Sequence, residues 1–163
     1  MAYLEKYLRG DDIGIIAPYA AQISLLTRLL NTDGKYRKRF LATLGDHRAM
    51  QLGEIEVRTV DGFEGREKEV IIFSTVRNNP WGYIGFLGDR RRLNVGLTRA
   101  KRGLFVVGSL STLGSGRMSQ GQGKSCRGAE AWRRYTEYLS EHRMVVTLAG
   151  ARLQRMLYGC TAM

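Results

Sequence analysis

Cysteine and histidine, which build most thiol and metal sites, are scarce in this sequence: 163 residues contain two of each. Cys126 and Cys160 show neither zinc-site nor disulfide-framework spacing. His47 and His142 have no carboxylate or cysteine at ligand spacing, and no Ser-His-Asp or Cys-His nucleophile is suggested. We therefore expect no metal held by this chain's own residues, and a reducing compartment, the cytoplasm or the nucleus.

Long apolar runs and acidic residues are also in short supply. No run approaches the roughly 18 apolar residues of a membrane span, and the opening MAYLEKYLRGDD lacks the apolar core of a signal peptide. Lys and Arg number 26 against 15 Asp and Glu, which gives a net charge of +11. Such an excess favours anionic partners. Nucleic acid is the first candidate and acidic membrane surfaces are the second, and we expect no membrane-spanning segment.

Strand and helix patterns alternate along the chain. Strands separated by helices, with apolar runs typical of burial on both faces, predict a three-layer α/β domain with a mostly parallel sheet. Ligands bind such sheets at the carboxyl ends of the strands, so the loops after Ile16, Val60 and Val76 are the places to search. The strands are expected at residues 13–19, 54–60, 70–76, 103–109 and 144–148, and the helices at 20–30, within 91–103 and at 129–142.

The chain length predicts one domain. Its core is expected at residues 1–109, followed by a flexible Gly/Ser-rich segment at 110–128. A terminal helix and strand of the same domain are expected at 129–148, and a tail at 149–163. The segment contains MSQGQGKS, which ends in Gly-Lys-Ser like a phosphate loop. Met118 stands where that loop needs its first glycine, so we interpret this stretch as a linker.

The stretch RTVDGFEGREKEV places two glycines directly after a predicted strand. Gly62 and Gly65 permit tight or positive-φ geometry, and Arg66 and Glu67 then come to the edge of the sheet. A strand end of this kind can present backbone N–H groups to a phosphate. From the residues alone, an ordinary connection between two strands remains an equally valid interpretation.

Two stretches concentrate positive charge. In RRLNVGLTRAKRG, helical spacing would place Arg92 and Arg99 about two turns apart on one face, with Gly96 leaving a gap between them. A row of arginines beside a gap suits a polyphosphate, although such side chains also extend into water. KYRKRF, residues 35–40, is expected to form a basic loop. It is suited either to a phosphate backbone with a stacked base or to solvent.

Three blocks carry a resemblance to a known family. IGIIAPYAAQ, VRTVDGFEGREKEVIIFSTVRNN and GFLGDRRRLNVGLTRAKRGLFVVGS resemble motifs IV, V and VI of superfamily 1 helicases, in the branch that contains senataxin and the nonsense-mediated-decay helicase. The likeness covers residues 12–109. It implies the second, C-terminal RecA-like domain of a helicase motor, which closes on an N-terminal RecA-like domain around ATP and Mg²⁺ and contacts single-stranded RNA or DNA.

The resemblance also implies roles for individual residues. Arg99 is similar to the motif VI arginine that reaches the γ-phosphate, with Arg92 as its helper, and these two are the implied catalytic pair. Glu67 resembles the motif V carboxylate at the nucleotide, with Gly65 beside it. The implied contacts to nucleic acid are Pro18, Tyr19, Thr59, Val60, Arg77 and Asn78.

The likeness has departures. Glu64 stands where the family usually has Gln, which would weaken phosphate binding, and Gly96 replaces the usual Ala, which looks mild. The phosphate loop and the Mg²⁺-binding acidic motif of the first RecA-like domain are not found in these 163 residues. Two other functions therefore stay open: a non-catalytic basic remnant that binds nucleic acid, and a module that docks on a separate RecA-like partner.

Overall fold

The fold is built on one parallel sheet. The computed structural model describes residues 8–117 and 127–148; residues 1–7, 118–126 and 149–163 lie outside the described part. Four strands follow the order β2-β1-β3-β4, and each neighbouring pair is parallel. This arrangement confirms the predicted α/β, RecA-like fold class. The strands are β1 (Ile13–Ala17), β2 (Glu56–Thr59), β3 (Lys68–Ser74) and β4 (Ala100–Val107).

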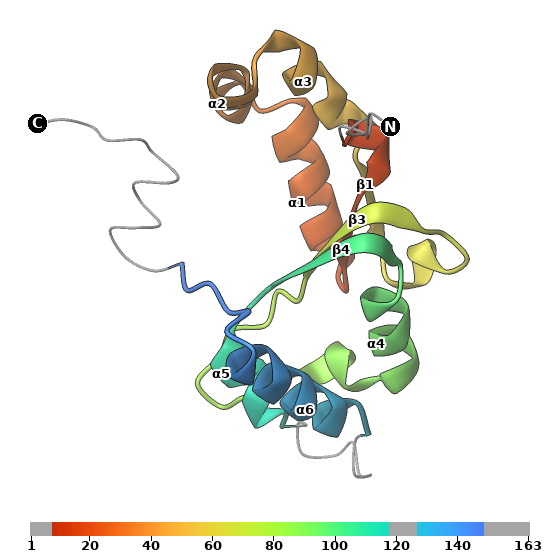
Figure 1. Ribbon diagram of the computed structural model, residues 1–163, viewed down its shortest axis with the longest axis vertical. Helices are drawn as coiled ribbons and strands as arrows, with labels where there is room; N and C mark the ends of the chain where they lie inside the picture. The colour runs from red at the N-terminus through yellow and green to blue at the C-terminus, as the bar shows by residue number, and fades with distance from the viewer. Residues whose placement is uncertain (1–7, 118–126, 149–163) are drawn as a thin grey trace, which may run out of the picture.

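Helices cover both faces of this sheet. Figure 1 shows α1, α2 and α3 above the strands and α4, α5 and α6 below them. Among the described residues, no helix is long and apolar enough to cross a membrane. The α-helices are α1 (Ala20–Asn31), α2 (Gly34–Leu44), α3 (Asp46–Met50), α4 (Arg90–Leu97), α5 (Leu110–Ser115) and α6 (Arg127–Glu141), and the short 3-10 helices are η1 (Gly10–Asp12), η2 (Gln51–Glu54), η3 (Asp61–Phe63) and η4 (Gly85–Gly88).

The main core lies between the sheet and the layer of α4, α5 and α6. Trp132 of α6 is fully buried and donates its indole N–H to the carbonyl of Leu87, at 3.0 Å. Its ring packs 6.1 Å from the ring of Phe73 and 6.0 Å from that of Tyr135. Because a large aromatic side chain fills the space and its N–H is paired, α6 is held firmly against η4 and β3.

The stretch KYRKRF is a helix, and the prediction of a loop there was wrong. Asp33 caps α2 by accepting hydrogen bonds from the amides of Lys35 and Tyr36, at 3.0 and 3.3 Å. Gly45 ends the helix with a φ of 75°. The stretch Asn-Thr-Asp-Gly, in which α1 ends, therefore also contains the N-cap of α2.

The predicted last strand is absent. Residues 144–148 have no regular secondary structure and pair with no strand in the described part of the chain, and Met144 and Val146 are well exposed. Burial of both faces also fails at β4, where Phe105 is 61% exposed and Val107 is 55% exposed. The reason is that α1 packs on β1 and β2, so this face of β4 receives no helix.

The predicted flexible segment, residues 110–128, contains helical residues at both ends. Ser109 caps α5, which ends at Gly116 with a φ of 51°, and Arg117 pairs with Tyr83. At the other end, α6 begins at Arg127. Residues 118–126, which hold most of MSQGQGKS, and the predicted tail at 149–163 lie outside the described residues. Flexibility of the segment stays a prediction.

Gly96 leaves no gap for a ligand, which corrects the expectation from the sequence. It is buried, and a Cβ built on it would lie 2.7 Å from the ring of Phe73. Phe73 is itself only 1% exposed. The missing side chain at position 96 therefore makes room for a core aromatic ring, and a methyl group at this position has no space.

Gly96→Ala is therefore expected to lower the free energy of unfolding by up to about 2 kcal/mol. The overpacking of a dense core costs about 1–3 kcal/mol and outweighs the better helix propensity of Ala, about 1 kcal/mol. Urea unfolding followed by circular dichroism measures the change. Gly34→Ala is the matched control, because a Cβ at Gly34 meets no atom within 4 Å.

The cause of this loss is tested with Phe73→Leu. If the clash is with the ring, Gly96→Ala costs less in the Phe73→Leu background, with a coupling of about 1 kcal/mol. An equal cost in both backgrounds contradicts the explanation.

Candidate functional site

Arg92 lies on α4, and the other nine predicted site residues fall into two groups at opposite ends of the sheet. Gly65 and Glu67 precede β3 and Arg99 precedes β4, so these three lie at the amino ends of the strands. The others follow β1, β2 and β3 at the carboxyl ends. The expectation that ligand-binding residues gather at the carboxyl ends is therefore right only for the second group. That group consists of Pro18, Tyr19, Thr59, Val60, Arg77 and Asn78.

Arg99 is not part of a helix. Helix α4 ends at Leu97 with Thr98 as its C-cap, and the carbonyl oxygen of Arg99 accepts a hydrogen bond from the amide of Lys68, at 3.0 Å. This bond joins Arg99 to the start of β3. The predicted arginine row, with Arg92 and Arg99 on one helical face, is therefore wrong, because pairing between β3 and β4 begins one residue after Arg99.

The guanidinium of Arg99 has unused hydrogen-bonding capacity. One terminal nitrogen donates to the hydroxyl of Thr98, at 3.0 Å. The Nε atom is buried and has no hydrogen-bond partner among the described residues. A buried N–H without an acceptor costs about 1–3 kcal/mol. Because the atom is buried, an anion can reach it only when the guanidinium turns outward, and accepting from it then removes this penalty.

Glu67 is displayed at the same end by its neighbours. Arg66 and Lys68 both contact Glu56 of β2, at 2.8 and 3.3 Å. Because side chains alternate along an extended chain, Glu67 projects away from this ion cluster and is exposed. Burial tends to raise the pKa of Glu56, but hydrogen bonds from Arg58 and Lys68 outweigh this and hold the pKa below its ordinary value.

Gly65 allows the turn that precedes Glu67. Its φ is 74°, and a Cβ on it would meet no atom within 4 Å. The residue is exposed, so glycine is needed here for backbone conformation and not because of crowding. The space around Gly65 leaves its backbone open to an approaching ligand.

A short crossover joins the two ends of the sheet. From the carboxyl end of β2 the chain passes through η3 to the amino end of β3. Phe63, in the middle, is fully buried and lies against Gly14 of β1, where a Cβ would come within 2.5 Å of the ring. Val60 is only 1% exposed. Its side chain, like that of buried Pro18, packs inside the protein, so only backbone groups of these two predicted contacts can reach a ligand.

Arg92 is bound to the beginning of this crossover. Its Nε and a terminal nitrogen donate to the two carboxylate oxygens of Asp61, at 3.0 and 3.1 Å. The guanidinium also lies 3.8 Å from the centroid of the Phe86 ring. Hydrogen bonds to Asp61 raise the pKa of Arg92 above its ordinary value. The two donors of the Arg92 guanidinium that could bind a phosphate side by side are therefore already bound to the carboxylate of Asp61.

Tyr19 and Arg77 form the centre of the carboxyl-end group. The Nε of Arg77 donates to the Tyr19 hydroxyl, at 2.7 Å, and its guanidinium lies 5.2 Å from the centroid of that ring. The Tyr19 ring is in turn 5.9 Å from the ring of Phe86. Arg77, Tyr19, Phe86 and Arg92 therefore form a continuous stack that reaches from the end of β3 to α4.

The backbone is strained where β3 leads into this group. Val76 has a φ of 65°, and the amide of Arg77 bonds to the carbonyl of Thr75, at 2.7 Å. A positive φ is rare for a β-branched residue, and residues in such conformations cluster at functional sites. Asn78 is exposed directly beyond this turn, while Thr59, at the end of β2, is half-buried and accepts from the amide of Gly62.

Three residues near the site were missed from the sequence. Asn79 bonds Tyr83 twice, through its amide N–H₂ and its side-chain oxygen, and its backbone bonds Thr112; the dipeptide Asn79-Pro80 was its available signal. Glu56 contacts Lys68, and Phe86 contacts Tyr19, across longer stretches of chain, and no local pattern indicated these contacts.

Comparison with known proteins gives the family. The profile of a family described as "AAA domain" matches residues 1–111. The chain is 45% identical over 103 residues to DNA polymerase alpha-associated DNA helicase A of Saccharomyces cerevisiae, covering 63% of this chain and 13% of that protein. It is 41% identical over 111 residues to the regulator of nonsense transcripts 1 homolog of Drosophila melanogaster, covering 68% and 8%. It is 44% identical over 101 residues to helicase sen1 of Schizosaccharomyces pombe, covering 62% and 5%.

The chain thus spans only a small part of each of these relatives, at most 13% of their length. The matched profile covers more than half of the chain, and its residues 1–111 include the crossover, α4 and β4. Together they show that the chain belongs to the superfamily 1 helicases of the senataxin and nonsense-mediated-decay type.

Proposed function

We propose that this chain is the second motor domain of an ATP-dependent helicase that acts on RNA or DNA in the cytoplasm or nucleus. The observation that carries the proposal is the state of Arg99. Its Nε is buried and unpartnered at the amino end of the sheet, beside the exposed carboxylate of Glu67. Such an arrangement fits an anionic ligand that completes the site from outside the domain.

At this end the chain supplies half of an ATP site. Arg99 donates to the γ-phosphate and stabilises the negative charge that grows as the phosphoryl group moves to water. Glu67 and the open backbone at Gly65 contact the nucleotide from the other side of the β3–β4 pair. Arg92, held by Asp61, acts through the crossover by keeping it against α4, and so has a positioning role.

The Mg²⁺ that accompanies ATP requires ligands from a partner domain. Among the described residues, no group of three His, Cys, Asp or Glu side chains is close enough to hold a metal ion. A carboxylate and a phosphate-loop hydroxyl normally hold this ion in such motors. We therefore propose an N-terminal RecA-like domain, in cis or in trans, that provides both the phosphate loop and these ligands.

At the carboxyl ends of the strands the chain supplies part of a single-strand track. Asn78 is exposed, and Tyr19 and Arg77 are half-buried with their polar groups directed at each other. The strained turn at Val76 presents the backbone of this segment outward. The crossover through Phe63 then connects the nucleic-acid end with the ATP end over a short stretch of chain.

A second candidate function is a basic remnant that binds nucleic acid without catalysis. The observation that favours it is α2, whose residues Arg37 and Lys38 are exposed on the side of the sheet away from α4. This function needs no ATP. The two functions therefore differ in the effect of replacing Arg99 in a protein that also has the N-terminal motor domain. The replacement impairs the first function and leaves the second unchanged.

The chain alone is expected not to hydrolyse ATP, because neutralisation of the β- and γ-phosphates needs the phosphate-loop lysine and Mg²⁺ ligands. Release of inorganic phosphate by the purified 163-residue protein is the measurement. Arg99→Ala is the control for contaminating activity. Steady turnover that disappears in Arg99→Ala would show that the chain holds a complete site.

In the two-domain enzyme, Arg99→Ala is expected to lower kcat by about 10³-fold or more. Nucleotide affinity changes little, because a group that acts mainly in the transition state leaves ground-state binding intact. Arg99→Lys restores only part of the rate, since Lys lacks the planar fork. Glu67→Gln is expected to change nucleotide affinity as well as rate.

Lys101→Ala is the matched control for Arg99→Ala, since it removes an exposed cation two residues away. Steady-state ATPase and equilibrium binding of a fluorescent nucleotide are measured on each variant. If Arg99→Ala hydrolyses ATP like the parent, the arginine does not face the γ-phosphate and the basic-remnant function is favoured.

The chain alone is expected to bind single-stranded oligonucleotides weakly, with little sequence preference. Its contacts are mainly to phosphates, so the logarithm of the binding constant should fall linearly with the logarithm of salt concentration. Fluorescence anisotropy with labelled oligouridine and oligothymidine, over a series of salt concentrations, gives this slope. Affinity that does not change with salt contradicts binding through the basic surface.

A further inference from the structure

A third group of cations lies apart from both ends of the sheet, where α4 and α6 begin side by side. It surrounds a hollow of about 730 Å³. A second hollow, of about 340 Å³, adjoins the first and shares Arg90 and Arg127 with it. We call the two hollows together the arginine groove. Its lining residues are Asp89, Arg90, Arg91, Asn94, Arg127, Glu130, Ala131 and Arg134.

The fold holds the walls of this groove in place. The indole of Trp132 bonds to the carbonyl of Leu87, just before α4. One turn earlier on α6, Gly128 lies so close to the backbone of Gly88 that a Cβ at position 128 would overlap its carbonyl oxygen. The starts of the two helices are therefore fixed relative to each other by buried contacts, and their arginines extend from a rigid base.

Helix α4 directs its residues to three different places. Arg92 points to Asp61 and Phe86, and Leu93 and Gly96 are buried. Arg90 and Asn94, four residues apart, share a face of the helix, and with Arg91 they line the groove and are exposed. Arg90 and Arg91, which line the groove, are thus separate from Arg92, which holds the crossover.

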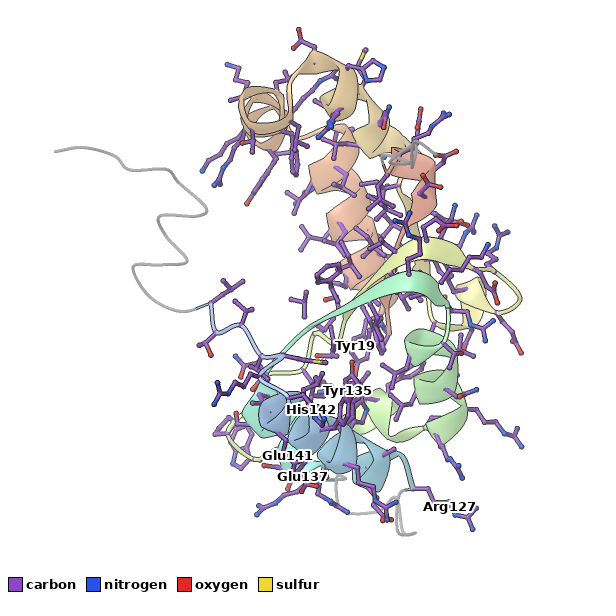
Figure 2. All side chains as sticks on the ribbon, viewed as in Figure 1. Tyr19, Arg127, Tyr135, Glu137, Glu141 and His142 are labelled. Carbon is purple, nitrogen blue, oxygen red and sulfur yellow. The ribbon has the colours of Figure 1, made fainter. Side chains whose placement is uncertain are left out.

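Both carboxylates in the groove are already used. Asp89 caps α4 by accepting from the amides of Arg91 and Arg92, and Glu130 accepts from the guanidinium of Arg134, at 2.6 Å. By contrast, the guanidinium groups of Arg90, Arg91 and Arg127 have no ion pair with any carboxylate among the described residues. Figure 2 shows Arg127 projecting outward at the beginning of α6, at the opposite end of that helix from Glu137 and Glu141.

We propose that the arginine groove binds the phosphodiester backbone of a single strand, as a continuation of the track at the carboxyl ends of the strands. Three guanidinium groups on a concave surface match successive phosphates, because arginine binds phosphate oxygens through its fork. The stack of Tyr19, Phe86 and Arg92 leads from the predicted track directly to the first turn of α4. The groove begins on the adjoining face of that turn.

The strand is chosen over a soluble polyphosphate for a structural reason. The groove is open and long, running over two joined hollows, whereas a small ligand is usually enclosed by its pocket. The inference rests on the proposed function, since it extends a nucleic-acid track that is itself a proposal. The experiment below therefore separates failure of the groove from failure of the track.

The test compares two double variants of the full chain. Arg90→Ala/Arg127→Ala removes two cations of the groove, and Arg28→Ala/Lys101→Ala removes two exposed cations elsewhere, so the net charge changes equally. Binding to labelled oligouridine is measured by anisotropy at several salt concentrations. Each lost phosphate contact lowers the salt slope by about 0.7 for single strands. The groove variant is therefore expected to lose about 1.4 from the slope and to bind roughly 25-fold more weakly at 0.1 M salt.

Each outcome decides the proposal. A groove variant that binds like the control variant overturns the groove and leaves the proposed function standing, whereas a parent chain that binds no oligonucleotide overturns both. Competition with tripolyphosphate separates the sources of phosphate. If the groove variant binds the strand more weakly but binds tripolyphosphate as well as the parent does, the groove holds the strand. If tripolyphosphate binds the parent but not the groove variant while strand affinity is equal in both, the groove is a polyphosphate site and the proposal is wrong. Arg90→Gln/Arg127→Gln repeats the test if the alanine variant melts early.

Discussion

The contact between Phe63 and Gly14 is the constraint on which the rest of the structure depends. A parallel sheet normally returns from one strand to the next through a helix, but the chain between β2 and β3 has only η3 and two glycine-containing turns. This short path lies close to β1 because Gly14 has no side chain and the Phe63 ring takes its place. Consequently the two ends of the sheet are joined by one short, mostly exposed segment that is anchored by the buried ring of Phe63.

The pair formed by Asp61 and Arg92 gives this segment its second attachment. It adds to the burial of Val60 and Phe63 and to the ion pairs of Glu56 with Arg66 and Lys68. With it, the crossover is tied to α4, whose end leads directly to Arg99. An arginine that resembles a catalytic residue in the sequence thus has a different role in the fold. It holds the crossover to α4, whereas the Nε of Arg99 has no hydrogen-bond partner among the described residues.

The sequence predicted the order of elements well where local patterns decide them. The apolar runs of β1 and β3 and the spacing of α1 required no knowledge of distant residues. The N-cap Asp33 is also a signal that can be found in the local sequence. Helix α2 was missed because KYRKRF was interpreted by its positive charge and not by the capping residue before it. Local patterns could not predict the register, that is, which residues of neighbouring strands pair with each other. The end of α4 depends on where β4 begins to pair with β3, and this pairing removed Arg99 from the helix. The strand pattern of residues 144–148 likewise needed a neighbour, which the described chain does not provide.

The parallel register also determines how this chain must fold. Gly14 pairs with Glu56, and Ile13 pairs with Val70, so the central strand β1 finds its neighbours only after long stretches of chain have closed. Loop closure must therefore precede any stabilising strand contact, and domains of this kind fold slowly compared with helical bundles of the same size. During synthesis, β1 emerges first but can complete its pairing only when β3 has left the ribosome. For that interval its apolar residues stay without their sheet, and α1 and α2 are the neighbouring elements that can form from local contacts.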